Sequence, residues 1–161
     1  MSARGKGWLL TAVLAAVIAA VLGRAEPARA DVFIFVLDVS GSMLAADVDT
    51  AGTTRWDAMM EAVRDLIDLF PSGSQIGIAQ LESDTMVILT LTTSKTDALA
   101  ALANVDSASG GTATGPGIRT GLSLIAGNIS GDKRIILITD GVPNVSGTGA
   151  TPTQDAIDAA T

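Results

Sequence analysis

The stretch DVFIFVLDVSGSM, residues 31–43, decides the fold. Its first part, residues 32–37, is a run of apolar residues rich in β-branched and aromatic side chains. Such a run is typical of a strand that is buried on both faces of a sheet. The run ends at Asp38, and Ser40 and Ser42 follow at alternate positions in a turn that contains glycine. Because ligands of open α/β sheets bind just outside the carboxyl ends of the strands, the sequence predicts these three side chains in a site.

Three further strands are predicted. Residues 75–81 and 85–91 are joined by only three residues, which forces an antiparallel hairpin, and residues 135–139 form a second fully apolar strand. The two most hydrophobic strands are expected to be central. A right-handed crossover places the hairpin on one side of the first strand and the last strand on the other. The predicted fold is therefore an α/β sheet of order 3-2-1-4, mostly parallel with one antiparallel edge strand, and with helices on both faces.

Helical spacing of apolar residues predicts helices over residues 53–70 and 94–105. Thr54 and Ser94 are the expected caps, because an aspartate follows each of them three residues later. A third helix is predicted to begin near Pro116, and a fourth follows Thr151 over residues 152–161. The apolar face of the third helix comprises Ile118, Leu122, Ile125 and Ile129.

The composition excludes several kinds of chemistry. The chain has no cysteine and no histidine among its 161 residues. Disulfides, thiolate or imidazole metal ligands, and Ser-His-Asp or Cys-His catalysis are therefore absent. Any metal must be held by oxygen atoms.

The first thirty residues have the pattern of an export signal. A basic start, an apolar core of about fifteen residues and the sequence Ala28-Arg29-Ala30 predict a signal peptide cleaved after Ala30. An uncleaved anchor helix is the alternative. Either way residues 31–161 form one domain that is expected outside the cytoplasm, in the periplasm, on the cell surface or secreted.

The charge balance bears on partners. The chain has 10 basic and 17 acidic residues, and residues 1–30 hold four of the basic and one of the acidic ones, so the remainder carries about −10. A strongly acidic domain is a poor match for nucleic acid or for direct binding to an anionic membrane.

Two more segments can reach the predicted crevice between the first and last strands. The glycine-rich stretch at residues 107–117 carries Thr112 and lacks the lysine that a phosphate-binding loop requires. The last strand ends at Asp140. Asp47 and Asp49 lie in the loop after the first strand and are interpreted as a solvated acidic loop. A supplementary role near a metal is the alternative, which their spacing does not favour.

Two carboxylates and three hydroxyls form a set of hard oxygen donors. Mg²⁺ favours octahedral oxygen coordination and usually retains water. Asp38 and Asp140 together neutralise one divalent ion, so the ion stays electrophilic and can accept an outside carboxylate. A helix that begins near Gly115 would also favour an anion there. The set describes a binding site better than a catalytic one, since no candidate base lies beside it.

These residues carry a family resemblance. Asp38-x-Ser40-x-Ser42, Gly-Gly-Thr112 and Ile-Thr-Asp140-Gly141, in this order and each at a strand or loop end, resemble the von Willebrand factor type A (VWA) family. In that family the three motifs form the metal-ion-dependent adhesion site. The resemblance implies a Rossmann-like fold and a non-enzymatic, adhesive protein-binding role with Mg²⁺ or Mn²⁺.

The resemblance also implies a role for each residue. Ser40, Ser42 and Thr112 bind the ion directly, whereas Asp38 and Asp140 act mainly through water. A carboxylate of a protein ligand completes the coordination shell. Family domains usually continue with two more strands and helices, so the C-terminal strands are expected to be missing and the last predicted strand to be an uncovered apolar edge.

Two other functions are weighed against this one. A Mg²⁺-dependent hydrolase of the phosphatase kind would use Asp38 as its nucleophile. It would need a second carboxylate at position 40, which is serine, and a lysine near the site, whereas Lys133 lies at the far end of its strand. The other alternative is a structural scaffold with a vestigial metal site.

Overall fold

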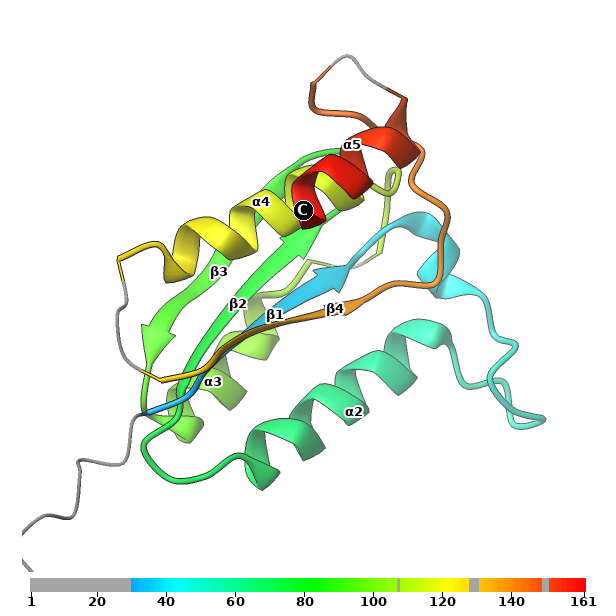
Figure 1. Cartoon of the computed structure of the whole chain (residues 1–161). Coiled ribbons are helices and arrows are strands. Elements are labelled where there is room, and N and C mark those ends of the chain that lie inside the picture. Colours follow the sequence, from blue (N-terminus) through cyan, green and yellow to red (C-terminus); the bar gives the residue numbers. More distant parts are fainter. Residues whose placement is uncertain (1–29, 107, 128–130, 149–150) are drawn as a thin grey trace, which may run out of the picture.

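A four-stranded sheet between two layers of helices forms the body of the protein (Figure 1). The computed structural model describes residues 30–106, 108–127, 131–148 and 151–161. The strands are β1 (Val32–Asp38), β2 (Gln75–Leu81), β3 (Thr85–Thr92) and β4 (Lys133–Ile138), in the order β3-β2-β1-β4. The predicted strand order is thereby confirmed.

Strand directions also follow the prediction. β1 pairs in parallel with β2 on one side and with β4 on the other, and β2 pairs with β3 antiparallel. Every residue of β1 is buried, as its unbroken apolar run requires. The turn that contains Ser40 and Ser42 therefore leaves the sheet at its most buried point, between two parallel neighbours.

The helices cover both faces of the sheet. They are α2 (Arg55–Leu69), α3 (Lys95–Ala101), α4 (Thr114–Ile125) and α5 (Pro152–Ala160), with short 3₁₀ turns η1 (Gly41–Leu44) and η2 (Leu102–Asn104). α2 and α3 lie on one face, and α4 and α5 lie on the other (Figure 1). Each face has its own apolar cluster, built on alternate residues of β1: Phe35 and Leu37 on the α2 side, and Ile34 and Val36 on the α4 side.

Caps define where α2 and α3 begin. The Thr54 side chain accepts a hydrogen bond from the Asp57 amide at 3.0 Å, and the Asp57 carboxylate accepts from the Thr54 amide, which completes a capping box. The Ser94 hydroxyl accepts from the Asp97 amide at 3.1 Å. Both predicted caps are confirmed, and on α2 the side chains of Val63 and Ile67 are buried.

Small residues let α4 lie close to the sheet. A Cβ atom on Gly117 would lie 2.6 Å from Leu81 Cδ2, and one on Gly121 would lie 3.0 Å from Val36 Cγ2. These distances leave no room for a side chain at Gly117. The close approach positions the loop before α4, which carries Thr112, over the carboxyl end of the sheet.

Some boundaries differ from the predicted ones. β4 begins at Lys133 and ends at Ile138, so Thr139 lies beyond the strand. α4 begins at Thr114, two residues before Pro116, and the predicted contribution of Ile129 lies outside the described residues. The helix predicted up to residue 105 tightens into η2 after Ala101.

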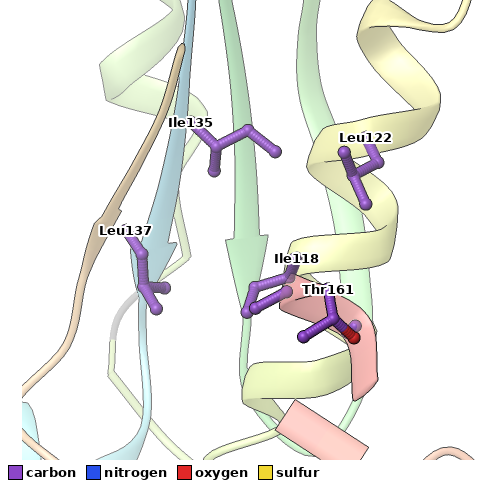
Figure 2. Close-up of a pocket in the computed structure, with 7 residues that line it drawn as sticks. Ile118, Leu122, Ile135, Leu137 and Thr161 are labelled. Carbon is purple, nitrogen blue, oxygen red and sulfur yellow. The ribbon is translucent and has the colours of Figure 1, made fainter. Parts of the chain in front are cut away.

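The expectation that both of the most hydrophobic strands are central is correct for β1 only. Within the described chain, β4 pairs on one side, with β1. Its residues Ile135 and Leu137 are half-buried, and together with Ile118 and Leu122 of α4 they line an apolar pocket of ≈ 340 Å³ (Figure 2). Thr161, which follows α5, lines the same pocket.

The described helices include none that is long and apolar enough to cross a membrane. The predicted signal peptide, residues 1–30, lies outside the described residues except for Ala30.

Candidate metal centre

Asp38 is the fixed point of the candidate site. It is the last residue of β1 and is fully buried. Its Oδ1 accepts a hydrogen bond from the Ser40 amide at 2.8 Å, and its Oδ2 accepts one from the Thr139 hydroxyl at 2.5 Å. The carboxylate therefore ties the turn after β1 to the segment after β4, which agrees with a role in which Asp38 holds the serines in place.

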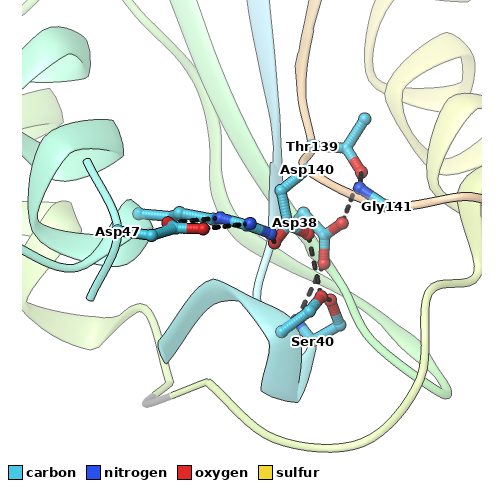
Figure 3. A network of polar contacts seen from close by, with 8 residues as sticks. Asp38, Ser40, Asp47, Thr139, Asp140 and Gly141 are labelled. Carbon is cyan, nitrogen blue, oxygen red and sulfur yellow. Dashed lines mark hydrogen bonds and ion pairs between the residues drawn. The ribbon is translucent and has the colours of Figure 1, made fainter. Parts of the chain in front are cut away.

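The two serine hydroxyls lie side by side. Ser40 Oγ and Ser42 Oγ are 3.1 Å apart, and Ser42 Oγ donates to Asp140 Oδ1 at 2.8 Å (Figure 3). Ser40 is buried and Ser42 is exposed, so the pair reaches from the interior to the surface. Asp140 follows β4, and the predicted crevice between β1 and β4 is thus formed by residues of both strand ends.

Thr112 approaches the same point from the loop before α4. It is 2% exposed, and its amide donates to Asn144 Oδ1 at 2.7 Å. A Cβ atom on Gly141 would lie 3.1 Å from Thr112 Oγ1 and 3.9 Å from Ser42 Oγ. The hydroxyls of Thr112 and Ser42 therefore both face the backbone of Gly141. The structure brings all five predicted site residues to one end of the sheet.

The donor set fits a small divalent cation. An octahedral ion that binds oxygen at about 2.0–2.1 Å separates neighbouring ligand oxygens by about 3 Å. The Ser40–Ser42 and Ser42–Asp140 oxygen distances, 3.1 and 2.8 Å, are those of hydrogen bonds and are compatible with this spacing, so the chemistry of the donors is what indicates an ion. The described residues include no group of three or more Asp, Glu, His or Cys side chains that could hold a metal, so hydroxyls would have to supply direct ligands.

Arg55 is a member of the site that the sequence did not reveal. It is the first residue of α2, and its Nη1 donates to Asp140 Oδ2 at 2.5 Å. Its Nε and Nη2 donate to the two carboxylate oxygens of Asp47 at 2.9 and 2.5 Å. This ion pair holds the pKa of Asp47 below its usual range and raises that of Arg55. Asp47 is exposed, as expected of a residue in a solvated loop, and it is also paired with Arg55, which connects it to Asp140.

The start of α4 is expected to favour an anion, and a carboxylate of the chain itself, that of Asp155, lies there. A Cβ atom on Gly115 would lie 2.5 Å from Asp155 Oδ2, so the buried Asp155 carboxylate of α5 lies against the first turn of α4. Arg119 and the Gly147 amide each donate to the same oxygen at 2.9 Å. This end of α4 is thus covered by the chain itself.

Thr139 and Asn144 also contact site residues, and the sequence does not predict either of them as part of the site. Thr139 has a local signal, because it directly precedes Asp140, but the predicted strand includes it and its hydroxyl is therefore expected in the sheet. Asn144 lies 32 residues from the backbone amide that it binds. Lys133 is the first residue of β4, at the opposite end from Asp140, as the sequence indicated.

The sequence pattern of the von Willebrand factor type A domain family matches residues 33–142. This match covers more than half of the chain, and the chain belongs to that family. It includes all five candidate site residues and, apart from Val32 at the start of β1, the four strands. A comparison with curated protein sequences returned no significant match.

Solved structures show the same fold. A conserved hypothetical protein, BatB, from Bacteroides thetaiotaomicron is 28% identical, with a TM-score of 0.64 over 81% of this chain and 61% of its own. A von Willebrand factor type A protein from Catenulispora acidiphila is 25% identical, with a TM-score of 0.64 over 81% of this chain and 30% of its own. An aerotolerance-related membrane protein from Bacteroides fragilis NCTC 9343 is 25% identical, with a TM-score of 0.63 over 81% of this chain and 62% of its own. The chain therefore spans less than two thirds of the length of these proteins.

Proposed function

We propose that this domain is an exported protein-binding module of the adhesion type, which holds Mg²⁺ or Mn²⁺ and binds a carboxylate of a partner protein through that ion. The family fits a protein-interaction role. The observation that carries the proposal is the convergence of five oxygen-bearing side chains, from three segments, at one end of the sheet.

The charge of the site supports an acidic ligand. Asp38 and Asp140 are the only carboxylates among the five residues, and Asp38 already accepts hydrogen bonds on both of its oxygens. Asp140 also has both oxygens engaged, by Ser42 and Arg55. An ion held mainly by neutral hydroxyls keeps most of its positive charge, and a partner's carboxylate would complete its shell favourably. The exposed Ser42 is where such a ligand would enter.

Export is part of the same proposal. The N-terminal pattern of the sequence favours it, and one of the similar solved proteins is described as a membrane protein. A signal peptide cleaved after Ala30 would release the domain. The negative net charge of the released domain argues against direct binding to an anionic membrane or to nucleic acid.

Bound Mn²⁺ offers a direct test of the open coordination position. Mn²⁺ enhances the relaxation of water protons while exchangeable water remains on the ion. We expect the purified full chain to bind Mn²⁺ with strong enhancement, and acetate, used as a minimal carboxylate, to reduce the enhancement by displacing water.

Chloride at the same ionic strength is the control, because it screens charge without acting as a carboxylate ligand. If acetate and chloride had the same effect on a fully bound ion, the site would not accept an outside carboxylate, and the adhesive role would be contradicted.

A further inference from the structure

Arg55 and Asp47 form an ion pair beside the candidate metal centre that the five-residue motif does not include. We propose that Arg55, held by Asp47, is a positioning residue of this centre, which fixes the Asp140 carboxylate in the orientation that metal binding requires. The inference rests on the proposed function, because it concerns the same ion.

The two oxygens of Asp140 have separate partners. Oδ2 accepts from Arg55 at 2.5 Å, whereas Oδ1 accepts from Ser42 at 2.8 Å. The Asp140 side chain is only 10% exposed, so water can replace few of these contacts. Arg55 therefore uses the oxygen on the far side from Ser42, and it leaves Oδ1 directed toward the hydroxyls that would hold the ion.

Asp47 in turn fixes Arg55. The Arg55 guanidinium donates to both Asp47 oxygens, at 2.9 and 2.5 Å, in the two-pronged geometry that arginine forms with carboxylates. A lysine, with one charged nitrogen, could not reach both carboxylates with the same geometry. Three of the guanidinium's nitrogens are thus engaged by two aspartates that come from different loops.

The position of Arg55 in α2 is locally unfavourable. It is the first residue of the helix, where the exposed amides carry partial positive charge and acidic residues are preferred. The charge of Arg55 is balanced by Asp47 in the preceding loop and by Asp140, which lies 85 positions away. A departure from the local helix rule whose partners include a candidate site residue favours a functional role.

Arg55 also repels a bound cation, and this repulsion lowers the Mg²⁺ affinity, whereas positioning of Asp140 raises it. Removing the positive charge of Arg55 alone would leave Asp47 unpaired, and this extra negative charge would attract a divalent ion. Replacing both residues, Arg55→Gln with Asp47→Asn, keeps the net charge and removes the contact that holds Asp140. Because loss of the adjacent positive charge would by itself strengthen binding of a cation, weaker binding by this double variant would indicate positioning.

The experiment is a Mg²⁺ titration of the full chain by calorimetry. We expect the R55Q/D47N variant to bind about tenfold more weakly than the unmodified protein, which is the usual effect of removing a group that orients a metal ligand. The matched control is R64Q/D65N, which changes the same residue types at two exposed positions of α2 and should leave the affinity unchanged. Equal affinity of R55Q/D47N and the unmodified protein would overturn the inference.

A second variant shows whether Arg55 acts through Asp140. In a background of Asp140→Asn, adding R55Q/D47N should cause no further loss of Mg²⁺ affinity, because the oriented carboxylate is already gone. A further tenfold loss there would contradict the inference. Circular dichroism confirms that each variant is folded, and Arg55→Lys, which retains the charge, should give an intermediate loss.

Different results would contradict the proposed function and the positioning role of Arg55. If the unmodified protein bound neither Mg²⁺ nor Mn²⁺, the proposed function would be wrong and this inference with it. If the unmodified protein bound the ion and R55Q/D47N bound it equally well, only the inference would be wrong.

Discussion

Thr139 shows how much a single hydroxyl contributes at this site. It donates to the buried Asp38 Oδ2 at 2.5 Å and accepts a hydrogen bond from the Gly141 amide at 3.2 Å. Without it, one oxygen of a fully buried carboxylate would have no donor among the contacts described here, at a cost of about 1–3 kcal/mol. The hydroxyl thus joins the last residue of β1 to the loop after β4.

Thr139→Val removes this hydroxyl and keeps the shape of the side chain. We expect the variant to bind Mg²⁺ about tenfold more weakly than the unmodified protein, because Asp38 is no longer held on both sides. Calorimetric titration measures the effect. Thr139→Ser, which retains the hydroxyl, should bind nearly as well as the unmodified protein, and an equal loss in both variants would contradict the role of the hydroxyl.

The site residues differ in how far the sequence could predict them. Asp38, Ser40, Ser42, Thr112 and Asp140 follow strand or loop ends, and the topology alone brings such ends together. Arg55 and Asp47 gave no comparable signal. Their contacts depend on where a flexible side chain reaches after the loops have folded, and no local spacing encodes that.

At the scale of elements, α4 is fitted to the sheet by glycine. Gly117 has Leu81 and Val36 within 3.1 Å of the place where a Cβ would lie, whereas Gly127 has no atom within 4 Å. Helix propensity favours alanine over glycine by about 1 kcal/mol. At Gly117 this preference is outweighed by packing.

Gly117→Ala is expected to lower the free energy of unfolding by about 1–3 kcal/mol, because the added methyl group has to displace Leu81 or lift α4 from β1 and β2. Chemical denaturation measures the change. Gly127→Ala makes the same substitution in open space and should stay within about 0.5 kcal/mol of the unmodified protein. If both variants were equally stable, the close packing of α4 would not be confirmed.

Asp155 fastens α5 and the loop before it to α4. Its buried carboxylate accepts from Arg119 at 2.9 Å, from the Gly147 amide at 2.9 Å and from the Thr148 hydroxyl at 2.8 Å. The hydrogen bond from Arg119, aided by the other two, lowers the pKa of Asp155 well below its usual range. Its contribution to stability is therefore present above the pKa of the unfolded chain, about 3.9, and is lost as the pH falls below it.

We expect Asp155→Asn to lower the thermal midpoint by several degrees at pH 7, and the difference from the unmodified protein to shrink as the pH falls from about 5 to 3. Thermal melts at a series of pH values test this. A difference that stayed constant over the whole range would show that protonation of Asp155 does not contribute to acid destabilisation.

Element boundaries show the limits of prediction from the sequence more clearly than element types do. All four strands and the caps of α2 and α3 followed from periodicity and from the Ser/Thr-x-x-Asp pattern. The early start of α4 at Thr114 did not, and the carboxylate of Asp155, 41 positions later in the chain, lies against its first turn. Tertiary contacts of this kind override local helix signals.

At the scale of the whole molecule, the candidate centre joins three segments that are far apart in the sequence. The turn after β1, the loop before α4 and the loop after β4 meet there through Ser42, Thr112 and Gly141. An ion bound at this point would link these three segments to one another. The order of strands, which the sequence did predict, is what places these segments together.

A Mg²⁺ titration of the purified full chain by calorimetry, repeated with Mn²⁺, tests the central claim most directly. We expect saturable binding of one ion, which is lost in Asp38→Ala and strongly weakened in Ser42→Ala. Ser72→Ala, an exposed serine away from the site, should bind like the unmodified protein. A protein that is folded by circular dichroism and binds neither ion would contradict the account.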